Sequence, residues 1–163
     1  MEILYEDNHI IALNKRAGEL VQVDKDCNES LEESVKRLIK ERDSKPFNVF
    51  LGVPHRLDRP VSGVVIFAKT SKALTRLNEM FRCGEVHKIY HAIVKNCPPK
   101  DEDLLTHFLL RNEKQNKTYA HEKPVPNAKE SRLRYKLVGK NDNYFLLEIE
   151  LLTGRHHQIR SQL

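Results

Sequence analysis

The chain has 163 residues, 39% of them hydrophobic and 31% charged, which suits one folded domain with its own core. Its net charge of +5 is compatible with an anionic polymer as a partner, although many basic proteins bind none. No apolar run approaches the roughly 20 residues needed to cross a bilayer, and the start of the chain is no signal peptide, so we expect a cytoplasmic protein with no membrane partner.

Five short runs in the first half of the chain are predicted to be extended, because they are rich in apolar residues and bounded by turn residues. They cover residues 3–6, 9–14, 20–23, 49–51 and 64–69. The last run reads V-V-I-F-A-K, with apolar side chains on both faces, and is expected to be a buried strand.

Two helices are predicted in the same half. Ser30 and Glu33 have the S-x-x-E form of a capping box, and apolar residues at helical spacing extend this helix to about residue 43. Ser71 is expected to cap a second helix that ends just before Gly84. Four of its apolar side chains are predicted to face inward: Leu74, Leu77, Met80 and Phe81.

Strands dominate the second half, at residues 86–95, 104–110, 118–121, 131–138 and 144–152. Residues 139–143 are typical of a hairpin connection. Thr153 is expected to cap a helix that begins at Gly154 and buries Ile159 and Leu163. Many strands joined by short turns, with few helices, predict an α+β domain around a largely antiparallel sheet.

The cysteines and histidines give no sign of a metal site. Cys27, Cys83 and Cys97 are odd in number and lack C-x-x-C spacing, which argues against a disulfide framework and against a zinc site. Each is expected to be a small buried hydrophobe. His156 and His157 are adjacent and would face different sides of a helix, so they cannot form an i, i+4 pair of ligands.

The clearest candidate for chemistry is Asp58, which ends the sequence H-R-L-D just before the buried strand. A loop aspartate usually caps a turn, but here Arg56 and Arg59 flank it and Pro60 stiffens the loop. Neighbouring guanidinium groups favour an ionised carboxylate, which is fit to attack a sugar carbon or to stabilise an oxocarbenium ion. No second carboxylate is obviously paired with Asp58, which argues against two-carboxylate glycoside hydrolysis.

Arg155 and Tyr90 are the candidate partners. A guanidinium can grip a carboxylate with two hydrogen bonds, and Gly154 permits close backbone approach at the expected helix start, although a plain surface arginine fits the pattern too. Tyr90 lies mid-strand and is either a half-buried core residue or a platform for an extruded base. Residues 111–140 carry a surplus of Lys and Arg that could follow phosphates or simply form a solvated face.

Taken together, these residues resemble the motifs of the RluA-type pseudouridine synthases. H-R-L-D, a three-residue gap and S-G occupy residues 55–63, and K-x-Y-x-A occupies 88–92. Residues 152–160, L-T-G-R-x-H-Q-I-R, are similar to a third motif. Residues 12–18, A-x-N-K-x-x-G, resemble the opening motif, with Arg16 where a proline is usual. Four motifs in the right order cover essentially the whole chain.

The resemblance implies a pseudouridine-synthase fold, a mixed, largely antiparallel sheet flanked by helices, with an RNA-binding cleft along one face. It implies that Asp58 is the catalytic aspartate, Tyr90 the stacking tyrosine and Arg155 the ion-pair partner of Asp58. Arg56 would help to evict the uridine or fill its vacancy. The implied activity is isomerisation of uridine to pseudouridine at a specific site in structured rRNA or tRNA. No metal or cofactor is expected, because nothing is oxidised and no group is transferred from outside, and a monomer is the default expectation.

Residues 1–163 are therefore expected to form one pseudouridine synthase catalytic domain. Members of this family normally continue well beyond the third motif, so the domain is expected to be truncated at its C-terminal end. No separate N-terminal RNA-binding module is expected, since the catalytic pattern begins near residue 3. Two alternatives stay open: an inactive RNA-binding protein of the same fold, and a nucleoside or glycoside hydrolase that uses Asp58.

Overall fold

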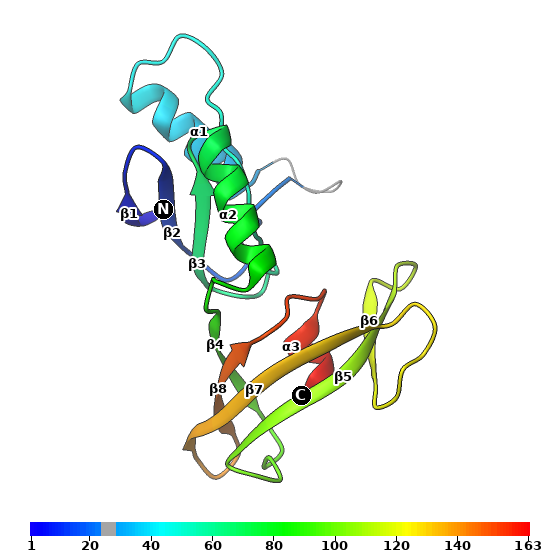
Figure 1. The fold of residues 1–163 in the computed structure, drawn as a ribbon. Coiled ribbons are helices and arrows are strands. Elements are labelled where there is room, and N and C mark those ends of the chain that lie inside the picture. The colour runs from blue at the N-terminus through cyan, green and yellow to red at the C-terminus, as the bar shows by residue number, and fades with distance from the viewer. Residues whose placement is uncertain (24–28) are drawn as a thin grey trace. The chain divides into compact units, whose positions relative to one another are not determined.

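A computed structural model describes residues 1–23 and 29–163 of the chain. The chain divides into two compact units, residues 1–83 and 84–163 (Figure 1). Every strand pairing in the described residues is antiparallel, which confirms the predicted α+β class and its largely antiparallel pairing. Among these residues, no helix is both long and apolar enough to span a membrane.

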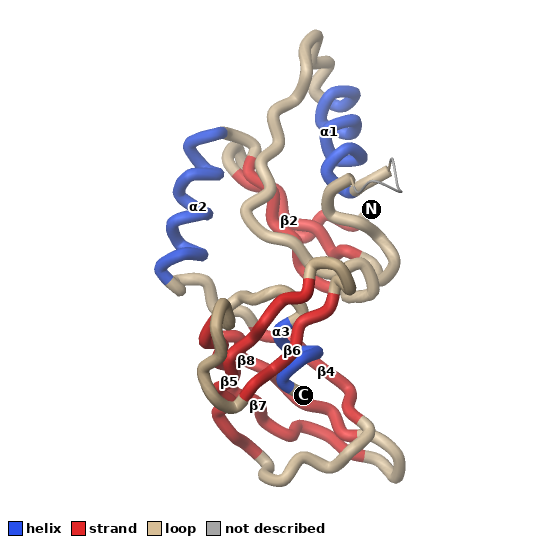
Figure 2. Tube along the Cα trace, turned by 90° about the vertical axis from the view of Figure 1, so that its right-hand side faces the viewer, coloured by secondary structure: helices blue, strands red, loops and turns tan. Residues whose placement is uncertain are grey.

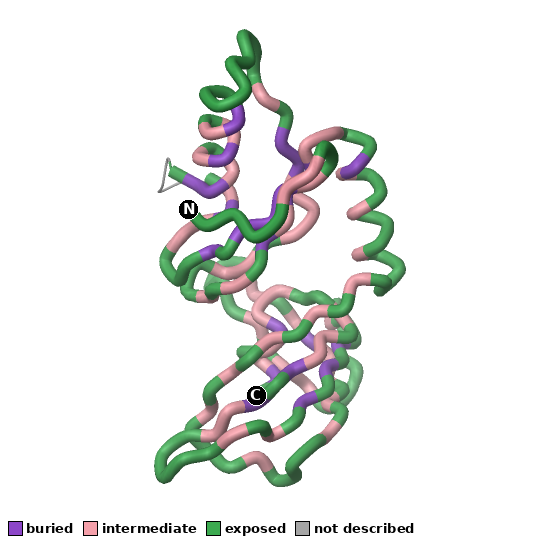
Figure 3. The backbone as a smooth tube through the Cα atoms, turned by 90° about the vertical axis from the view of Figure 1, so that its left-hand side faces the viewer, coloured by how far each residue is buried: buried purple, intermediate pink, exposed green. Residues whose placement is uncertain are grey.

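The first unit combines a three-stranded sheet with helices. Its elements, in chain order, are β1 (Glu2–Glu6), β2 (Ile10–Lys15), α1 (Leu31–Arg42), β3 (Gly63–Ala68) and α2 (Ser71–Cys83). The strands lie in the order β1-β2-β3. Figures 2 and 3 show α1 and α2 on opposite sides of these strands.

The core of the first unit lies between α1 and one face of the sheet. Side chains alternate across a strand, so the register that pairs β2 with β3 gathers fully buried residues on one face. They are Ile11, Leu13, Val65 and Phe67. Leu31, Val35 and Ile39 of α1 pack against them. Burial of each such side chain stabilises the fold by about 1.5–3 kcal/mol, so this face fixes where β3 lies.

The start of α1 confirms its predicted cap. The Ser30 hydroxyl accepts a hydrogen bond from the Glu33 backbone N–H at 3.3 Å. The free N–H groups of Leu31 and Glu32 donate to carbonyls in the segment that precedes the cap, those of residues 20 and 21. Residues 20–23 do not form a strand, and the carbonyl groups of residues 20 and 21 bind the start of the helix instead of a sheet.

The cap of α2 differs from the prediction. The Thr70 hydroxyl, one residue before the helix, accepts from the Ala73 backbone N–H at 3.1 Å, so Thr70 is the capping side chain and not Ser71. Met80 is 39% exposed and does not face a core, because α2 is buried only at Ala73. Gly84 has a φ of +74°, which confirms the predicted end of the helix.

Residues 49–51 were expected to be a strand, and the structure has none there. Instead, Gly52 pairs with Ala68 of β3 through two backbone hydrogen bonds of 2.8 and 2.9 Å. A Cβ at position 52 would lie 2.7 Å from the Leu74 Cδ2 of α2, so a larger residue there would require the Leu74 side chain to move. This contact leads the chain from the sheet edge into the loop that carries Asp58.

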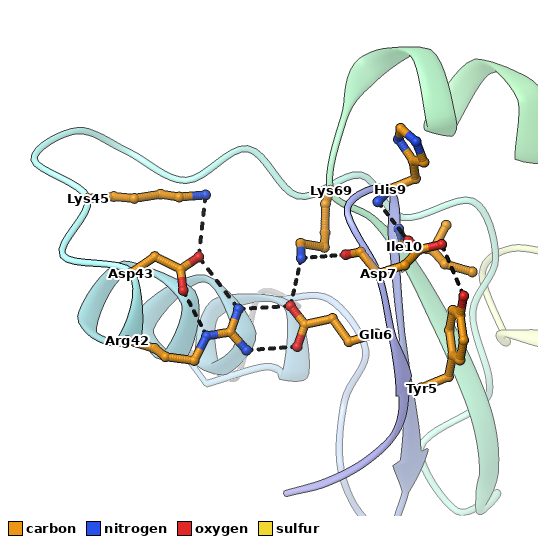
Figure 4. A network of polar contacts seen from close by, with 9 residues as sticks. All are labelled: Tyr5, Glu6, Asp7, His9, Ile10, Arg42, Asp43, Lys45 and Lys69. Carbon is orange, nitrogen blue, oxygen red and sulfur yellow. Dashed lines mark hydrogen bonds and ion pairs between the residues drawn. The ribbon is translucent and has the colours of Figure 1, made fainter.

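A network of charged side chains ties β1, α1 and β3 together (Figure 4). The Glu6 carboxylate accepts two hydrogen bonds from Arg42 at 2.7 and 2.8 Å, and a third from Lys69 at 2.6 Å. Lys69 also donates to the Asp7 carbonyl, and Arg42 pairs with Asp43. The bonds from Arg42 and Lys69 lower the pKa of Glu6 to about 2.

The Glu6→Gln substitution is expected to lower the free energy of unfolding by about 2 kcal/mol at pH 7. The folded-state pKa lies below the ordinary value, so the stabilisation is complete above about pH 4.5 and is lost as the pH falls to about 2. Urea unfolding followed by circular dichroism should show the wild type and the variant converging over that window. The exposed Glu41→Gln is the matched control, and an equal loss there would contradict this account.

The second unit is a five-stranded sheet with one short helix in its described residues. Its elements are β4 (Ile89–Val94), β5 (Glu102–Asn112), β6 (Lys117–His121), β7 (Lys129–Lys140), β8 (Phe145–Leu151) and α3 (Gln158–Gln162). The strands lie in the order β4-β8-β7-β5-β6. Its core is built from Leu133, Tyr135, Leu147 and Ile149 of the neighbouring strands β7 and β8.

The C-terminal helix differs from the prediction in its start and in its buried face. It begins at Gln158 instead of Gly154, and the residue before it, His157, has a left-handed backbone with φ +50°. Gln158 and Gln162 are buried, whereas Leu163 is 45% exposed and Ile159 is partly buried against the core. The side-chain amides of Gln158 and Gln162 therefore face the interior, where they form hydrogen bonds.

The cysteine prediction was wrong for the two cysteines that the structure describes. Cys83 and Cys97 are both exposed, since one ends α2 and the other lies in the turn after β4. Cys27 lies outside the described residues.

Candidate active site

Asp58 lies in the loop between Gly52 and β3 and is partly buried. Its carbonyl accepts a hydrogen bond from the Val61 backbone N–H at 3.0 Å, which closes a tight turn over Arg59 and Pro60. Arg56 is exposed, so its guanidinium is accessible to a ligand. The loop therefore carries the carboxylate on a closed turn that a packed strand follows.

A buried lysine side chain binds the backbone of this turn. Lys15, the last residue of β2, is 0% exposed, and four backbone carbonyl oxygens lie within hydrogen-bonding distance of its three N–H donors. They belong to Arg16, Asp58, Arg59 and Val61, and each lies within 3.2 Å. Three of the four carbonyls are in the Asp58 turn, so one side chain fixes the backbone of that turn.

The charge of Lys15 also acts on this part of the molecule. Burial lowers the pKa of the Lys15 ammonium group, while the negative charges of Glu19 and Asp58 oppose that shift. The negative charge of Asp58 therefore favours the charged form of the Lys15 ammonium group. Lys15 thus supplies a fixed positive charge beneath the turn.

The end of the opening motif also forms hydrogen bonds with this turn. The Gly18 N–H donates to the Arg59 carbonyl at 2.7 Å, and the Arg59 Nε donates back to the Gly18 carbonyl at 3.1 Å. Gly18 has a φ of +93°, a conformation that glycine adopts without strain. The Arg16 N–H donates to the Glu19 carboxylate at 2.7 Å, a bond that a proline at this position could not make.

Two further contacts fix the start of the H-R-L-D segment. The His55 Nε2 accepts a hydrogen bond from the Ile66 backbone N–H of β3 at 3.0 Å, which requires that this nitrogen carries no proton. The His55 ring also packs against Phe81 of α2, with ring centroids 4.9 Å apart. Leu57 packs on the core of the first unit. The side chains on either side of Arg56 are thus structural.

Tyr90 lies on the inner face of β4, and Lys88 immediately precedes this strand. Tyr90 is half-buried against the core of the second unit, and pairs with Ile149 of β8. Lys88 is partly buried too, and this burial lowers the pKa of its ammonium group. The alternation of burial in β4 confirms the predicted common face for Tyr90, Ala92 and Val94, although the strand begins at Ile89 and not at residue 86.

Arg155 lies in the loop between β8 and α3, with its side chain exposed. Its backbone N–H donates to the Gln158 side-chain oxygen at 3.0 Å, and its carbonyl accepts from the Gln158 backbone N–H at 3.2 Å. Thr153, expected as a helix cap, instead exchanges hydrogen bonds with the Arg132 backbone of β7. The loop is thereby anchored to the sheet while the guanidinium stays accessible.

The basic residues of β7 lie on the outer face of the second sheet, beside acidic neighbours. Arg134 pairs with Glu150 at 3.0 Å, and Arg132 lies 3.5 Å from Glu130. Lys136 is placed opposite Glu148 in the register of the neighbouring strand. The basic side chains of β7 therefore pair with acidic neighbours on a face open to solvent. For the residues of β7, this pairing favours a solvated face over a surface that follows phosphates.

Two residues outside the predicted site organise it, Lys15 beneath the Asp58 turn and Gln158 beside Arg155. The signal for Lys15 is its position, since Ile11, Leu13 and Lys15 alternate along one strand and a lysine therefore continues the core face. The signal for Gln158 is weaker, because a glutamine inside a short polar helix is ordinary.

Comparison with known proteins agrees with these motifs. The profile of the family described as RNA pseudouridylate synthase matches residues 9–163. The chain is 35% identical over 162 residues to the ribosomal large subunit pseudouridine synthase C of Buchnera aphidicola subsp. Baizongia pistaciae, covering 99% of this chain and 49% of that protein. It is 33% identical over 175 residues to the tRNA pseudouridine synthase C of Salmonella typhimurium, covering 100% of this chain and 64% of that protein.

Solved structures share the fold. Human RNA pseudouridylate synthase domain containing 4 superposes with a TM-score of 0.81 at 22% identity, covering 98% of this chain and 62% of that one. The chain spans about half the length of the ribosomal relatives that it matches. Since the family profile extends over nearly all of its residues, the chain belongs to the RNA pseudouridylate synthase family.

Proposed function

We propose that this chain isomerises uridine to pseudouridine in structured RNA, with Asp58 as the catalytic aspartate. The observation that carries the proposal is the support beneath Asp58: a buried lysine and the opening motif both fix the backbone of its turn. A carboxylate that must meet one ribose carbon benefits from such preorganisation, because small displacements of a reacting group slow a reaction strongly.

The other candidate residues have distinct roles in the proposal. The target uridine leaves the stack, which costs a few kcal/mol and less in a loop or bulge. Tyr90 stacks on the extruded base, and Arg56 helps to evict it or fills the space that it leaves. Arg155 supplies a permanent cation that acts with the carboxylate of Asp58. The exposure of both guanidinium groups supports these assignments.

The reaction is balanced within the nucleotide. The bond between uracil N1 and ribose C1′ breaks, Asp58 assists that cleavage, and the uracil turns. A bond then forms between C5 and C1′, C5 loses its proton to a base or water, and N1 gains one. Because no atom is added and nothing is oxidised, this chemistry calls for neither a redox cofactor nor a group donor.

The proposed substrates are rRNA and tRNA, since the relatives named above are ribosomal and transfer RNA enzymes. The net charge of +5 favours a polyanion in either case. The same relatives leave both RNA classes open, so the test includes both.

Release of tritium from C5 tests this proposal. Large-subunit rRNA fragments and tRNAs are transcribed with uridine labelled at C5 and incubated with the purified chain. We expect tritium to appear in water in proportion to pseudouridine formed in at least one RNA. Binding of RNA without tritium release would support the inactive-protein alternative, and release of free uracil would support a hydrolase. Either result overturns the proposal.

A further inference from the structure

Two buried glutamines of α3 form a chain of amide hydrogen bonds that begins at the Arg155 loop. Gln158 is 3% exposed and Gln162 is 8% exposed, which is unusual for such polar side chains. The Gln158 Nε2 donates to the Gln162 Oε1 at 2.9 Å. A buried amide is tolerated only when its donors and acceptors are satisfied, so the partners at each end explain why both residues are inside.

Every polar position of the Gln158 side chain is used. Its Oε1 accepts from the Arg155 backbone N–H at 3.0 Å and lies 2.9 Å from the Thr153 hydroxyl. Its Nε2 donates to the Arg132 carbonyl of β7 at 3.1 Å, in addition to its bond to Gln162. One side chain therefore links the Arg155 loop, the central strand β7 and the rest of α3.

The far end of the chain reaches a different part of the sheet. The Gln162 Nε2 lies 3.1 Å from His107 Nδ1 and donates to the Ser131 carbonyl at 3.2 Å. These partners belong to β5 and β7, and none of them is in the Arg155 loop. Gln162 thus shares the burial and the helix of Gln158 without touching the loop.

We propose that Gln158 is a positioning residue for Arg155, because its amide fixes the backbone from which the exposed guanidinium projects. The Gln158 side chain holds the Arg155 N–H and its main chain holds the Arg155 carbonyl. The neighbouring His157 keeps a left-handed backbone, φ +50°, that a non-glycine residue adopts only when its surroundings impose it. The hydrogen bonds between Gln158 and the Arg155 backbone therefore restrain this loop.

The proposal rests on the proposed function for its kinetic consequence, so the experiment has a kinetic arm and a structural arm. Gln158→Met removes every hydrogen bond of the amide at nearly constant volume. Gln162→Met is the matched control, since it removes a buried amide from the same helix and leaves the bonds to Arg155 in place. Both variants are prepared in the full chain and used below their unfolding temperatures.

In the structural arm, hydrogen exchange of the Arg155 amide is followed by NMR. We expect at least a tenfold faster exchange in Gln158→Met and no change in Gln162→Met. In the kinetic arm, we expect kcat for pseudouridine formation to fall about 10–100-fold in Gln158→Met with the RNA affinity kept. Gln162→Met should keep its kcat even if its unfolding temperature falls as much as that of Gln158→Met.

The two arms separate the possible failures. Unchanged exchange at Arg155 in Gln158→Met overturns the positioning role, whatever the activity. An equal loss of kcat in both variants also overturns it, because a general loss of stability would then explain the effect. If the wild type forms no pseudouridine but the Arg155 amide is exposed selectively by Gln158→Met, the proposed function fails and the positioning of the loop stands.

Discussion

Replacement of Asp58 by Asn is expected to reduce pseudouridine formation at least about a thousandfold. The amide has the shape of the carboxylate but lacks its charge, so it can neither attack C1′ nor stabilise a positive charge there. The backbone of the turn is held by Lys15 and Gly18 through carbonyl groups, which the substitution does not alter. The fold should therefore survive.

Single-turnover assays and RNA-binding titrations check this prediction together. The dissociation constant for RNA should change by no more than about twofold, because loss of one negative charge does not weaken contacts to phosphates. Asp142→Asn, in the exposed hairpin between β7 and β8, is the control and should keep full activity. A comparable loss in both variants, or activity in Asp58→Asn, would remove Asp58 from the mechanism.

Replacement of Lys15 by Met is expected to have the second largest effect, on stability and on turnover. It removes an ammonium group that lies within hydrogen-bonding distance of four carbonyls at a fully buried position, and methionine offers no donor in return. Buried acceptors left without partners cost about 1–3 kcal/mol each, partly relieved by relaxation of the turn. We expect a loss of about 2–4 kcal/mol in the free energy of unfolding.

The turnover of the folded Lys15→Met variant should also fall, because the Asp58 turn loses its support. Lys69→Met is the matched control: it also removes a largely buried ammonium group, one that binds Glu6 and the Asp7 carbonyl, outside the Asp58 turn. Urea unfolding and single-turnover rates are compared for both. If Lys69→Met slows the folded enzyme as much as Lys15→Met, the special role of Lys15 is wrong.

Much of the fold follows from periodicity and capping signals. Alternating apolar residues predict β4 to β8 to within a few positions, and the S-x-x-E signal before α1 is confirmed by the bond from Glu33 to Ser30. The strand predicted at residues 49–51 is absent because its apolar side chains pack near Gly52, where the contact with the sheet is a single bridge. Short apolar runs do not show whether a strand partner is available.

Helix faces were predicted less well, for a physical reason. Met80 is exposed because α2 contacts the sheet over a small part of its length, and sequence periodicity cannot report how far a neighbour extends. In α3 the buried face consists of Gln158 and Gln162 and not of Leu163. Amide pairs that satisfy each other can replace apolar packing, and a hydrophobic pattern does not detect them.

The candidate site shows the same division between what motifs reveal and what they leave out. The motifs select Asp58, Arg56, Tyr90 and Arg155, whose roles stay predictions. They do not show that the opening motif supports the Asp58 turn through a buried amine, since hydrogen bonds to carbonyl groups leave no mark on the residues that accept them. Such support depends on backbone geometry, which the identity of the accepting residues does not encode.

The most direct measurement is a nucleoside mass balance on target RNA after incubation with the chain. If a carboxylate held on a rigid turn drives an internal rearrangement, pseudouridine must rise by the amount that uridine falls, with no uracil in solution, and the Asp58→Asn variant must leave both constant. A loss of uridine matched by free uracil, or conversion that persists without the carboxylate, would contradict it.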